Sequence, residues 1–349
     1  MRGAATALSL ALVAACGGAE TKAPEKPKQE AVDERTAEKD AKGLVTEIYQ
    51  TIGRSNTDGL MALLTDKLIV FGPRKADAMA TREDVLVTLR GTLDSMGKNG
   101  PKVRSGSLSV VASEGGLSAW AVDTIEIAGD EMAVTVVLEN DDDFWRVVAA
   151  AVARTPSAKS VRNELKKEAV VPTGMQGIPK VADAASGAVE RFKKGLADSE
   201  VWAEDLARRG DAVVVGAAAG ELTRGKKPIA ALWKKRQKVN VRYASAGELT
   251  AATTADDQIA WVTAPVVRFA DDEDAPLPLR LFAVFEKAGG EWRMISLQES
   301  VAMAEDGAGA SFKKISAPGV KVEEPPPPPP KKEEPVKKKK KKKKKKSSD

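Results

Sequence analysis

Residues 117–127 read LSAWAVDTIEI, and residues 259–269 read IAWVTAPVVRF. Both segments are rich in β-branched and aromatic residues, which predicts two long strands. The pair Ala119-Trp120 in the first segment corresponds to Ala260-Trp261 in the second, 141 residues later. This correspondence indicates that the chain contains one structural unit twice.

Two further landmarks recur at nearly the same spacing. Trp145-Arg146 corresponds to Trp292-Arg293 after 147 residues, and Gly72 corresponds to Gly216 after 144 residues. Three pairs of matching positions with nearly equal spacing predict an internal repeat.

Each copy predicts helices first and strands afterwards. In the first copy, apolar residues at Leu44, Val45, Ile48, Tyr49 and Ile52 have helical spacing, a short helix follows at Leu60–Leu64, and a strand at 68–71 ends at Gly72. The segment 81–84 (TRED) resembles a helix-capping box before a third helix. The remaining strands are expected at 108–111, 117–127, 132–138 and 144–152.

The second copy repeats this order. A helix is expected around Val189, Phe192 and Leu196, a strand at 213–215, and a helix after Thr223. Strands are expected around 239–244, 259–269, 279–286 and 292–297.

This element order resembles the SnoaL-like branch of the nuclear transport factor 2-like superfamily. The resemblance also rests on Trp-Arg at the start of the last strand of each copy and on the stretch from Gly225 to Ala230. It implies an α+β fold of tandem cone-shaped domains, each with amino-terminal helices packed on a curled antiparallel sheet. A single larger α+β domain is the alternative.

In this family the cone encloses a pocket, which catalytic members line with Asp, His or Tyr. Strand alternation places Asp123 on the same face as the apolar residues Ala119, Ala121 and Ile125, so Asp123 is a candidate general base and ligand-binding residue. Tyr49 is a candidate pocket hydroxyl. The alternatives are that Asp123 lies at a strand edge or pairs with an arginine, and that Tyr49 packs on a helix face. The position matching Asp123 in the second copy is Ala264.

The last strand departs from the catalytic pattern. Ser296, Gln298 and Ser300 occupy the alternating polar places in the second copy, where the family often has histidine. The first copy has Ala149, Ala151 and Ala153 there. Inherited catalysis is therefore not expected. The tryptophans Trp120, Trp145, Trp261 and Trp292 are expected in the core or at the cone rim, with stacking on a ligand as the alternative.

The composition excludes several kinds of chemistry. The chain has no histidine and one cysteine, which rules out Cys/His zinc sites, Ser-His-Asp and Cys-His catalysis, and an intramolecular disulfide. The acidic segments 141–143 and 271–274 lack the spacing of a calcium loop and are expected to be solvated hairpin tips. We expect no metal and no cofactor.

The amino terminus has the order of a secretory signal: Arg2, an apolar run from Ala4 to Val13, and small residues before the lone cysteine, Cys16. The sequence Val13-Ala14-Ala15-Cys16 resembles the lipobox of bacterial lipoproteins, in which the cysteine carries diacylglycerol. This resemblance implies a lipid anchor on Cys16, facing the periplasm of the bacterial envelope. Gly17, in place of an Asp retention signal, favours the outer membrane over the inner. An ordinary secretory signal with a chance cysteine is the alternative.

The carboxyl terminus carries most of the positive charge. Residues 313–349 hold 15 lysines and five acidic residues, a net charge of +10, so the rest of the chain carries −5. The run favours an extended, unfolded segment that contacts an anionic surface: anionic lipid, lipopolysaccharide, cell wall or DNA. An extension without a partner is the alternative. The contact residues are expected to be Lys337, Lys338, Lys339, Lys340, Lys341, Lys342, Lys343, Lys344, Lys345 and Lys346.

The predicted organisation is a signal peptide (1–15), a lipidated flexible linker (16–41), a first domain (42–155), a linker (156–183), a second domain (184–304) and a disordered Pro/Lys-rich tail (305–349). The expected function is that of a membrane-anchored, non-catalytic binding or scaffold module. The two domains are expected to pair with each other or across a homodimer. The alternatives are an isomerase- or cyclase-type enzyme that uses Asp123, and a carrier of a small apolar molecule.

Overall fold

The computed structural model describes residues 32–73, 78–95, 100–127, 129–161, 181–273 and 275–301. All described residues belong to one compact unit. The predictions for Cys16 and for the lysines Lys337–Lys346 therefore lie outside the described residues. No helix among the described residues is both long and apolar enough to cross a membrane.

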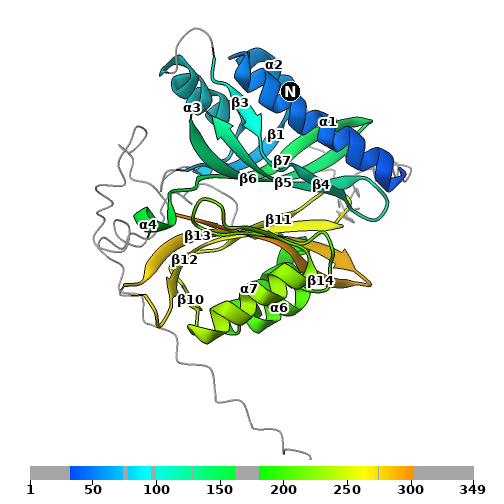
Figure 1. The fold of residues 1–349 in the computed structure, drawn as a ribbon. Coiled ribbons are helices and arrows are strands. Elements are labelled where there is room, and N and C mark those ends of the chain that lie inside the picture. The colour runs from blue at the N-terminus through cyan, green and yellow to red at the C-terminus, as the bar shows by residue number, and fades with distance from the viewer. Residues whose placement is uncertain are drawn as a thin grey trace, which may run out of the picture. The chain divides into compact units, whose positions relative to one another are not determined.

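The first domain contains three helices and a seven-stranded sheet (Figure 1). The sheet order is β2-β1-β7-β6-β5-β3, with β4 also paired to β5. The elements are α1 (Glu34–Gly53), α2 (Thr57–Ala62), β1 (Leu64–Phe71), β2 (Ala78–Met79), α3 (Arg82–Ser95), β3 (Val103–Ser105), β4 (Ser109–Ala112), β5 (Ser118–Ile127), β6 (Asp130–Asp141) and β7 (Phe144–Arg154).

The second domain repeats this topology strand for strand. Its seven-stranded sheet has the order β10-β12-β13-β14-β8-β9, with β11 also paired to β12. Two separate sheets with matching order exclude the alternative of a single larger domain. The elements are α4 (Ala158–Ser160), η2 (Asp183–Ala185), α5 (Ser186–Ala197), α6 (Glu200–Leu206), β8 (Val213–Val215), β9 (Leu222–Arg224), α7 (Lys226–Lys238), β10 (Arg242–Ser245), β11 (Thr250–Thr253), β12 (Ile259–Phe269), β13 (Leu277–Ala288) and β14 (Glu291–Ser300).

Each sheet is mixed rather than antiparallel. β1 pairs with β7 in parallel, and β8 pairs with β14 in parallel. A parallel neighbour requires a long crossover connection, and here the third helix and the intervening strands provide it. The predicted α+β fold of tandem domains is confirmed, and the named strands of each sheet pair antiparallel except at β1–β7 and β8–β14.

The first helix begins earlier than the predicted linker allowed. α1 begins at Glu34, and Asp33 caps it by accepting a hydrogen bond from the Thr36 amide. Ala37 and Ala41, one helical turn apart, are both fully buried. The predicted linker 16–41 therefore overlaps the domain, because two small apolar residues on one helix face are enough to pack this turn. The predicted linker 156–183 is likewise partly structured, since Val161 is buried in the core of the second domain.

A bulge in the last strand of each domain changes which residues face the helices. Val148 in β7 and Ile295 in β14 are the extra residues at register shifts against β6 and β13. One extra residue reverses the in-out alternation beyond it. In β14, Trp292 and Met294 face the helices before the bulge and Leu297 faces them after it, as does Val301 just beyond the strand.

The outer surfaces of the two sheets share a third hydrophobic core. This core combines Trp120, Val122 and Phe71 of the first domain with Trp261 and Phe282 of the second. Phe71 lies 6.1 Å, between ring centroids, from both Trp261 and Phe282. The helices of each domain cover the other face of its own sheet, as Figure 1 shows.

Polar contacts between the domains surround this shared core. Thr135 Oγ1 donates a hydrogen bond to Gln298 Oε1 at 2.6 Å, and Arg280 Nη1 donates one to the Gly72 carbonyl at 3.0 Å. Ser118 Oγ donates to Asp256 Oδ2 at 2.9 Å. Residues more than 130 positions apart in the sequence are thus held together by the two sheets.

Candidate functional site

Asp123 is buried inside the first domain, with 1 % of its surface exposed. It lies in β5 on the face that Ala119, Ala121 and Ile125 present to the helices, as strand alternation predicts. Its carboxylate accepts hydrogen bonds from Ser105 Oγ at 2.6 Å and from the Ser107 amide at 2.8 Å. These donors lie where the chain bends between β3 and β4, so Asp123 stabilises that bend.

Tyr49 reaches the same place from α1. Its hydroxyl oxygen is buried and makes no hydrogen bond of good geometry with any described residue. Burial, the nearby negative charge of Asp123 and its contact with that carboxylate together raise the pKa of Tyr49 well above its usual value. The two candidate residues from the sequence therefore lie side by side, with Tyr49 neutral.

Arg224 approaches this cluster from the second domain, and nothing in the sequence indicated it. Its Nη2 donates hydrogen bonds to the Ser107 carbonyl and, at 3.3 Å, to the Val122 carbonyl. Burial lowers the pKa of Arg224, and attraction to Asp123 offsets part of that effect. The hydrogen bonds of Arg224 go to Ser107 and to the Val122 carbonyl, which both adjoin Asp123, and no ion pair joins Arg224 to Asp123 among the described residues.

The second domain places a different charged cluster among its helices and strands. Glu299 in β14 has a fully buried side chain and contacts Arg236 Nη1 at 2.8 Å and Arg268 Nη1 at 3.0 Å. Tyr243 donates a hydrogen bond from its hydroxyl to Glu299 Oε1 at 2.6 Å. Strict alternation from Trp292 would place Glu299 on the sheet face away from the helices. The bulge at Ile295 reverses this, so the residue pattern did not indicate Glu299 as an interior residue.

Electrostatics keep this cluster ionised. Burial alone would raise the pKa of Glu299, but the positive charges of Arg236 and Arg268 and the hydrogen bond from Tyr243 hold it below the usual value. Burial raises the pKa of Tyr243, so this phenol stays protonated and donates. The carboxylate of Glu299 is therefore paired with two guanidinium groups and is not an available base.

Large aromatic side chains fill the interior of the second domain. Trp202 contacts Phe192 and Tyr243, with ring centroids 5.3 and 5.4 Å apart. Trp202 packs directly on Gly195 of α5, where an added Cβ atom would lie 1.7 Å from Trp202 Nε1. Ala264, which matches Asp123, lies in this apolar core.

The polar residues of the last strand do not line either interior. Ser296 and Gln298 pair with Val284 and Phe282, whose side chains belong to the core between the two sheets. Ala149 and Ala151 belong to the same shared core. Ser296 and Gln298 follow the bulge at Ile295, which turns them away from the helices and toward the core between the two sheets.

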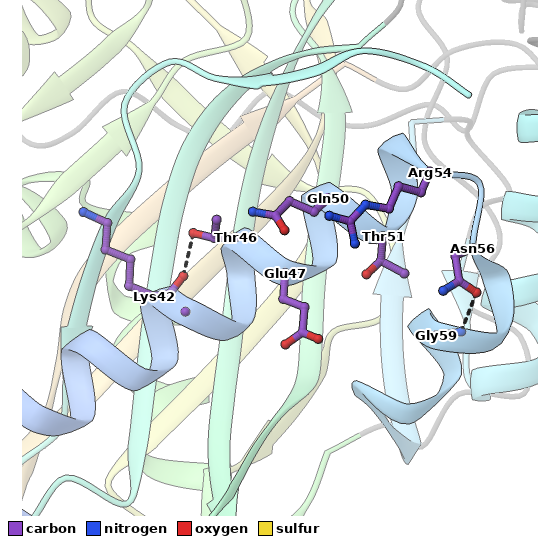
Figure 2. Close-up of a pocket in the computed structure, with 9 residues that line it drawn as sticks. Lys42, Thr46, Glu47, Gln50, Thr51, Arg54, Asn56 and Gly59 are labelled. Carbon is purple, nitrogen blue, oxygen red and sulfur yellow. Dashed lines mark hydrogen bonds between the residues drawn. The ribbon is translucent and has the colours of Figure 1, made fainter. Parts of the chain in front are cut away.

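A polar depression of about 600 Å³ lies along α1 and α2 (Figure 2). Its lining is mostly polar, with Glu47 and Gln50 on α1, Arg54 just after the end of α1 and Asn56 before α2. Asn56 accepts a hydrogen bond from the Gly59 amide at 2.9 Å, so it caps α2. This depression contains neither Asp123 nor Tyr49.

The tryptophans and the acidic segment 141–143, which the sequence also singled out, lie in packing or turn positions. Trp120 and Trp261 lie in the core between the sheets, whereas Trp145 and Trp292 pack at the margins of the two domain interiors. Asp142 and Asp143 have positive φ angles of 51° and 67° and form the tip of the β6–β7 hairpin. No group of three or more acidic or cysteine side chains among the described residues is arranged to hold a metal ion.

Comparison with known proteins agrees with the repeat. The model of a family described as the SnoaL-like domain matches residues 42–151 and again residues 199–304. No curated protein sequence matches the chain.

Several solved structures resemble one domain. An NTF2-like protein of unknown function from Pseudomonas putida is 15% identical over 36% of this chain and 92% of its own, with a TM-score of 0.33. A proposed dehydratase of the NTF2-like family from Streptomyces avermitilis is 13% identical over 35% of this chain and 99% of its own, with a TM-score of 0.31. A cystatin-like fold protein from Nostoc punctiforme is 11% identical over 37% of this chain and 97% of its own, with a TM-score of 0.31.

Proposed function

This chain belongs to the family of SnoaL-like domains and contains the domain twice, and from that premise we propose that it is a lipid-anchored, non-catalytic binding and scaffold module. The fold hosts both binding proteins and enzymes such as isomerases and dehydratases, so the fold does not decide between them. The decision depends on the residues inside each domain.

One observation carries the non-catalytic proposal: the acidic groups in the two interiors are already engaged. Asp123 accepts hydrogen bonds from Ser105 and Ser107, and Glu299 is paired with Arg236 and Arg268. Both oxygens of Asp123 are directed at donors of its own domain, whereas a general base must be directed at a substrate proton. In the second domain, the buried Trp202 packs against Phe192 and Tyr243, so aromatic side chains fill this part of the interior.

The sequence supports the membrane anchor and the role of the tail. Cys16 follows Val13-Ala14-Ala15 directly, and it is the one cysteine of the chain. Two or three acyl chains on this residue would hold the protein on the membrane stably. The lysine run Lys337–Lys346 would then contact an anionic surface of the envelope, which makes the protein a bridge between its membrane and that surface.

We further propose that the two domains pair within one chain and that the protein is a monomer. The apolar residues shared between the sheets, and the bonds Thr135–Gln298 and Arg280–Gly72, support this proposal. Sedimentation of the purified protein tests it. A monomer mass over a range of concentrations is expected, and a concentration-dependent dimer would contradict it.

Metabolic labelling with a fatty-acid analogue tests the anchor. Cells that make wild-type protein should incorporate label and keep the protein in the membrane fraction, whereas Cys16→Ala protein should be unlabelled. A wild-type protein that is unlabelled and soluble would overturn the anchor. A Cys16→Ala protein that is unlabelled but still membrane-bound would assign the retention to the lysine tail.

A second candidate function is an isomerase- or cyclase-type enzyme that uses Asp123. The observation that favours it is the buried Tyr49 hydroxyl, which lies beside Asp123 without a hydrogen bond of good geometry. Comparison of wild-type, Asp123→Asn and Tyr49→Phe proteins with a panel of small ketone and polyketide-like substrates tests it. Turnover that disappears in both variants, while the proteins stay folded, would replace the non-catalytic proposal.

A further inference from the structure

Helix α7 of the second domain carries an unusual charge pattern. Its sequence KKPIAALWKKRQK contains six basic residues and no acidic residue. The matching helix of the first domain, α3, has the sequence REDVLVTLRGTLDS, with two basic and three acidic residues. The two copies share a fold, so the fold itself does not require a basic helix at this place.

The lysines of α7 gather on its solvent face. Lys227, Lys234 and Lys238 are exposed and follow one another at intervals of seven and four residues, which places them on one side of a helix. The buried residues Ile229 and Trp233 lie on the other side and pack into the domain core. Lys235 is exposed beside this stripe, and Arg236 is turned inward to Glu299. Figure 1 shows α7 on the helix-covered face of the second sheet.

Helix stability does not explain the stripe. Cations in the last turn interact favourably with the helix dipole, which accounts for Lys235 and Lys238. Lys227 lies in the first turn, where the same dipole disfavours a positive charge. None of Lys227, Lys234 and Lys238 forms an ion pair with another described residue. On the same helix, Gln237 Nε2 donates a hydrogen bond to Glu200 Oε1 at 2.9 Å.

We infer that the lysine stripe of α7 (Lys227, Lys234, Lys235 and Lys238) is a second membrane-contact surface, which docks the second domain on anionic phospholipid head groups. The choice of a membrane over another anionic partner rests on the proposed function, because a lipid anchor would hold this domain close to a bilayer. No exposed aromatic side chain lies on α7 to stack with a nucleic-acid base, since Trp233 is buried. The stripe adds to the tail rather than replacing it.

Vesicle binding tests the inference with protein that lacks the lipid. The chain from residue 17 to 349 keeps every described residue, and replacing Lys337–Lys346 by glutamine removes the charge of the tail. In this background, the triple variant Lys227→Gln, Lys234→Gln, Lys238→Gln is compared with the control triple variant Arg35→Gln, Lys39→Gln, Lys42→Gln. The control removes the same charge from exposed positions of α1 in the first domain.

Partitioning is measured by co-sedimentation with phosphatidylcholine vesicles, with and without phosphatidylglycerol, at low salt. Each lysine near an anionic surface strengthens partitioning by about fivefold, so the α7 variant, which lacks three of them, should lose about 100-fold on the anionic vesicles. The control variant should lose about twofold or less, and neither should bind neutral vesicles. Added salt should reduce the difference between them.

Three outcomes would overturn the inference. Equal losses in the two triple variants would show a net-charge effect without a docking face. Unchanged binding of the α7 variant would show that the stripe does not contact the membrane. A loss of binding to duplex DNA, but not to anionic vesicles, would assign the stripe to nucleic acid. Because the assay uses unlipidated protein, failure of Cys16 labelling in cells is a separate result that leaves this test intact.

Discussion

Asp123 has a structural task that can be measured directly. In the Asp123→Ala variant the Ser107 amide and the Ser105 hydroxyl lose their acceptor inside the domain. Ser105 is exposed and Ser107 is partly exposed, so water replaces part of the lost acceptor, and we expect the free energy of unfolding to fall by about 1–2 kcal/mol. Asp123→Asn keeps one acceptor oxygen, so its loss of unfolding free energy should be about 1 kcal/mol smaller than that of Asp123→Ala. Urea denaturation measures the stability of both variants. An Asp123→Ala variant as stable as the wild type would show that the bend between β3 and β4 does not depend on this residue.

Glu299 gives a pH-dependent prediction. Its pKa is lower in the folded protein than the ordinary value of 4.5, so its contribution to stability is complete above that pH and is lost as the pH falls through the folded-state pKa. At neutral pH, Glu299→Gln removes the negative charge that pairs with the guanidinium groups of Arg236 and Arg268. The free energy of unfolding should therefore fall by about 3–5 kcal/mol. On acidification the wild type should lose more stability than the variant, because only the wild type has this carboxylate to protonate.

The exposed Glu291, in the same strand, provides the control. Its side chain is 76% exposed, and it makes only a 3.4 Å contact with Arg293. Glu291→Gln should leave both the stability and its pH dependence nearly unchanged. Equal pH curves for wild type and Glu299→Gln would show that the buried cluster does not govern acid stability.

At the scale of elements, the packing of α5 on α6 depends on a glycine. An added Cβ at Gly195 would collide with Trp202, which is fully buried and cannot move into solvent. Gly195→Ala should therefore lower the free energy of unfolding by about 3 kcal/mol. Gly43 of α1 is the matched control, because a Cβ there meets nothing within 4 Å. Gly43→Ala should stabilise by about 0.5–1 kcal/mol through helix propensity, and thermal unfolding distinguishes the two. A loss of stability in both variants would contradict this account.

The bulges at Val148 and Ile295 are also features of elements, and they explain the main failure of sequence reasoning at the site. Apolar residues continue on both sides of each bulge, so the pattern of residue types does not mark the extra residue. The register against the neighbouring strand, which forms only when β6 pairs with β7 and β13 with β14, reveals it.

At the scale of the whole molecule, the core shared by the sheets predicts that the two domains unfold together. Trp261→Ala removes a buried ring that stacks on Phe282 at 6.0 Å and contacts Phe71 of the first domain. We expect a cost of about 3–5 kcal/mol and a loss of amide-exchange protection in β5 and β6 as well as in β12 and β13. Phe144 is 66% exposed, so Phe144→Ala should change neither the free energy of unfolding nor the amide-exchange protection. Loss of protection confined to the second domain would mean that the domains fold independently.

The sequence by itself determined the repeat, the order of helices and strands in each copy, and the absence of histidine-based chemistry. It also placed Asp123 on the helix-facing side of its strand, because alternation within one regular strand is a local property. The sequence also predicted the cap of α3 from the segment 81–84. The Asp84 amide donates a hydrogen bond to Thr81 Oγ1 at the start of this helix.

Only the tertiary structure decided which residues meet across long separations. The parallel pairs β1–β7 and β8–β14, the approach of Arg224 to the backbone beside Asp123, and the enclosure of Glu299 by Arg236 and Arg268 all depend on how distant segments pack. A residue's type and its neighbours in sequence fix its local conformation. Strand register and sheet packing fix which face and which partner it has, and the pattern of residue types alone did not show either.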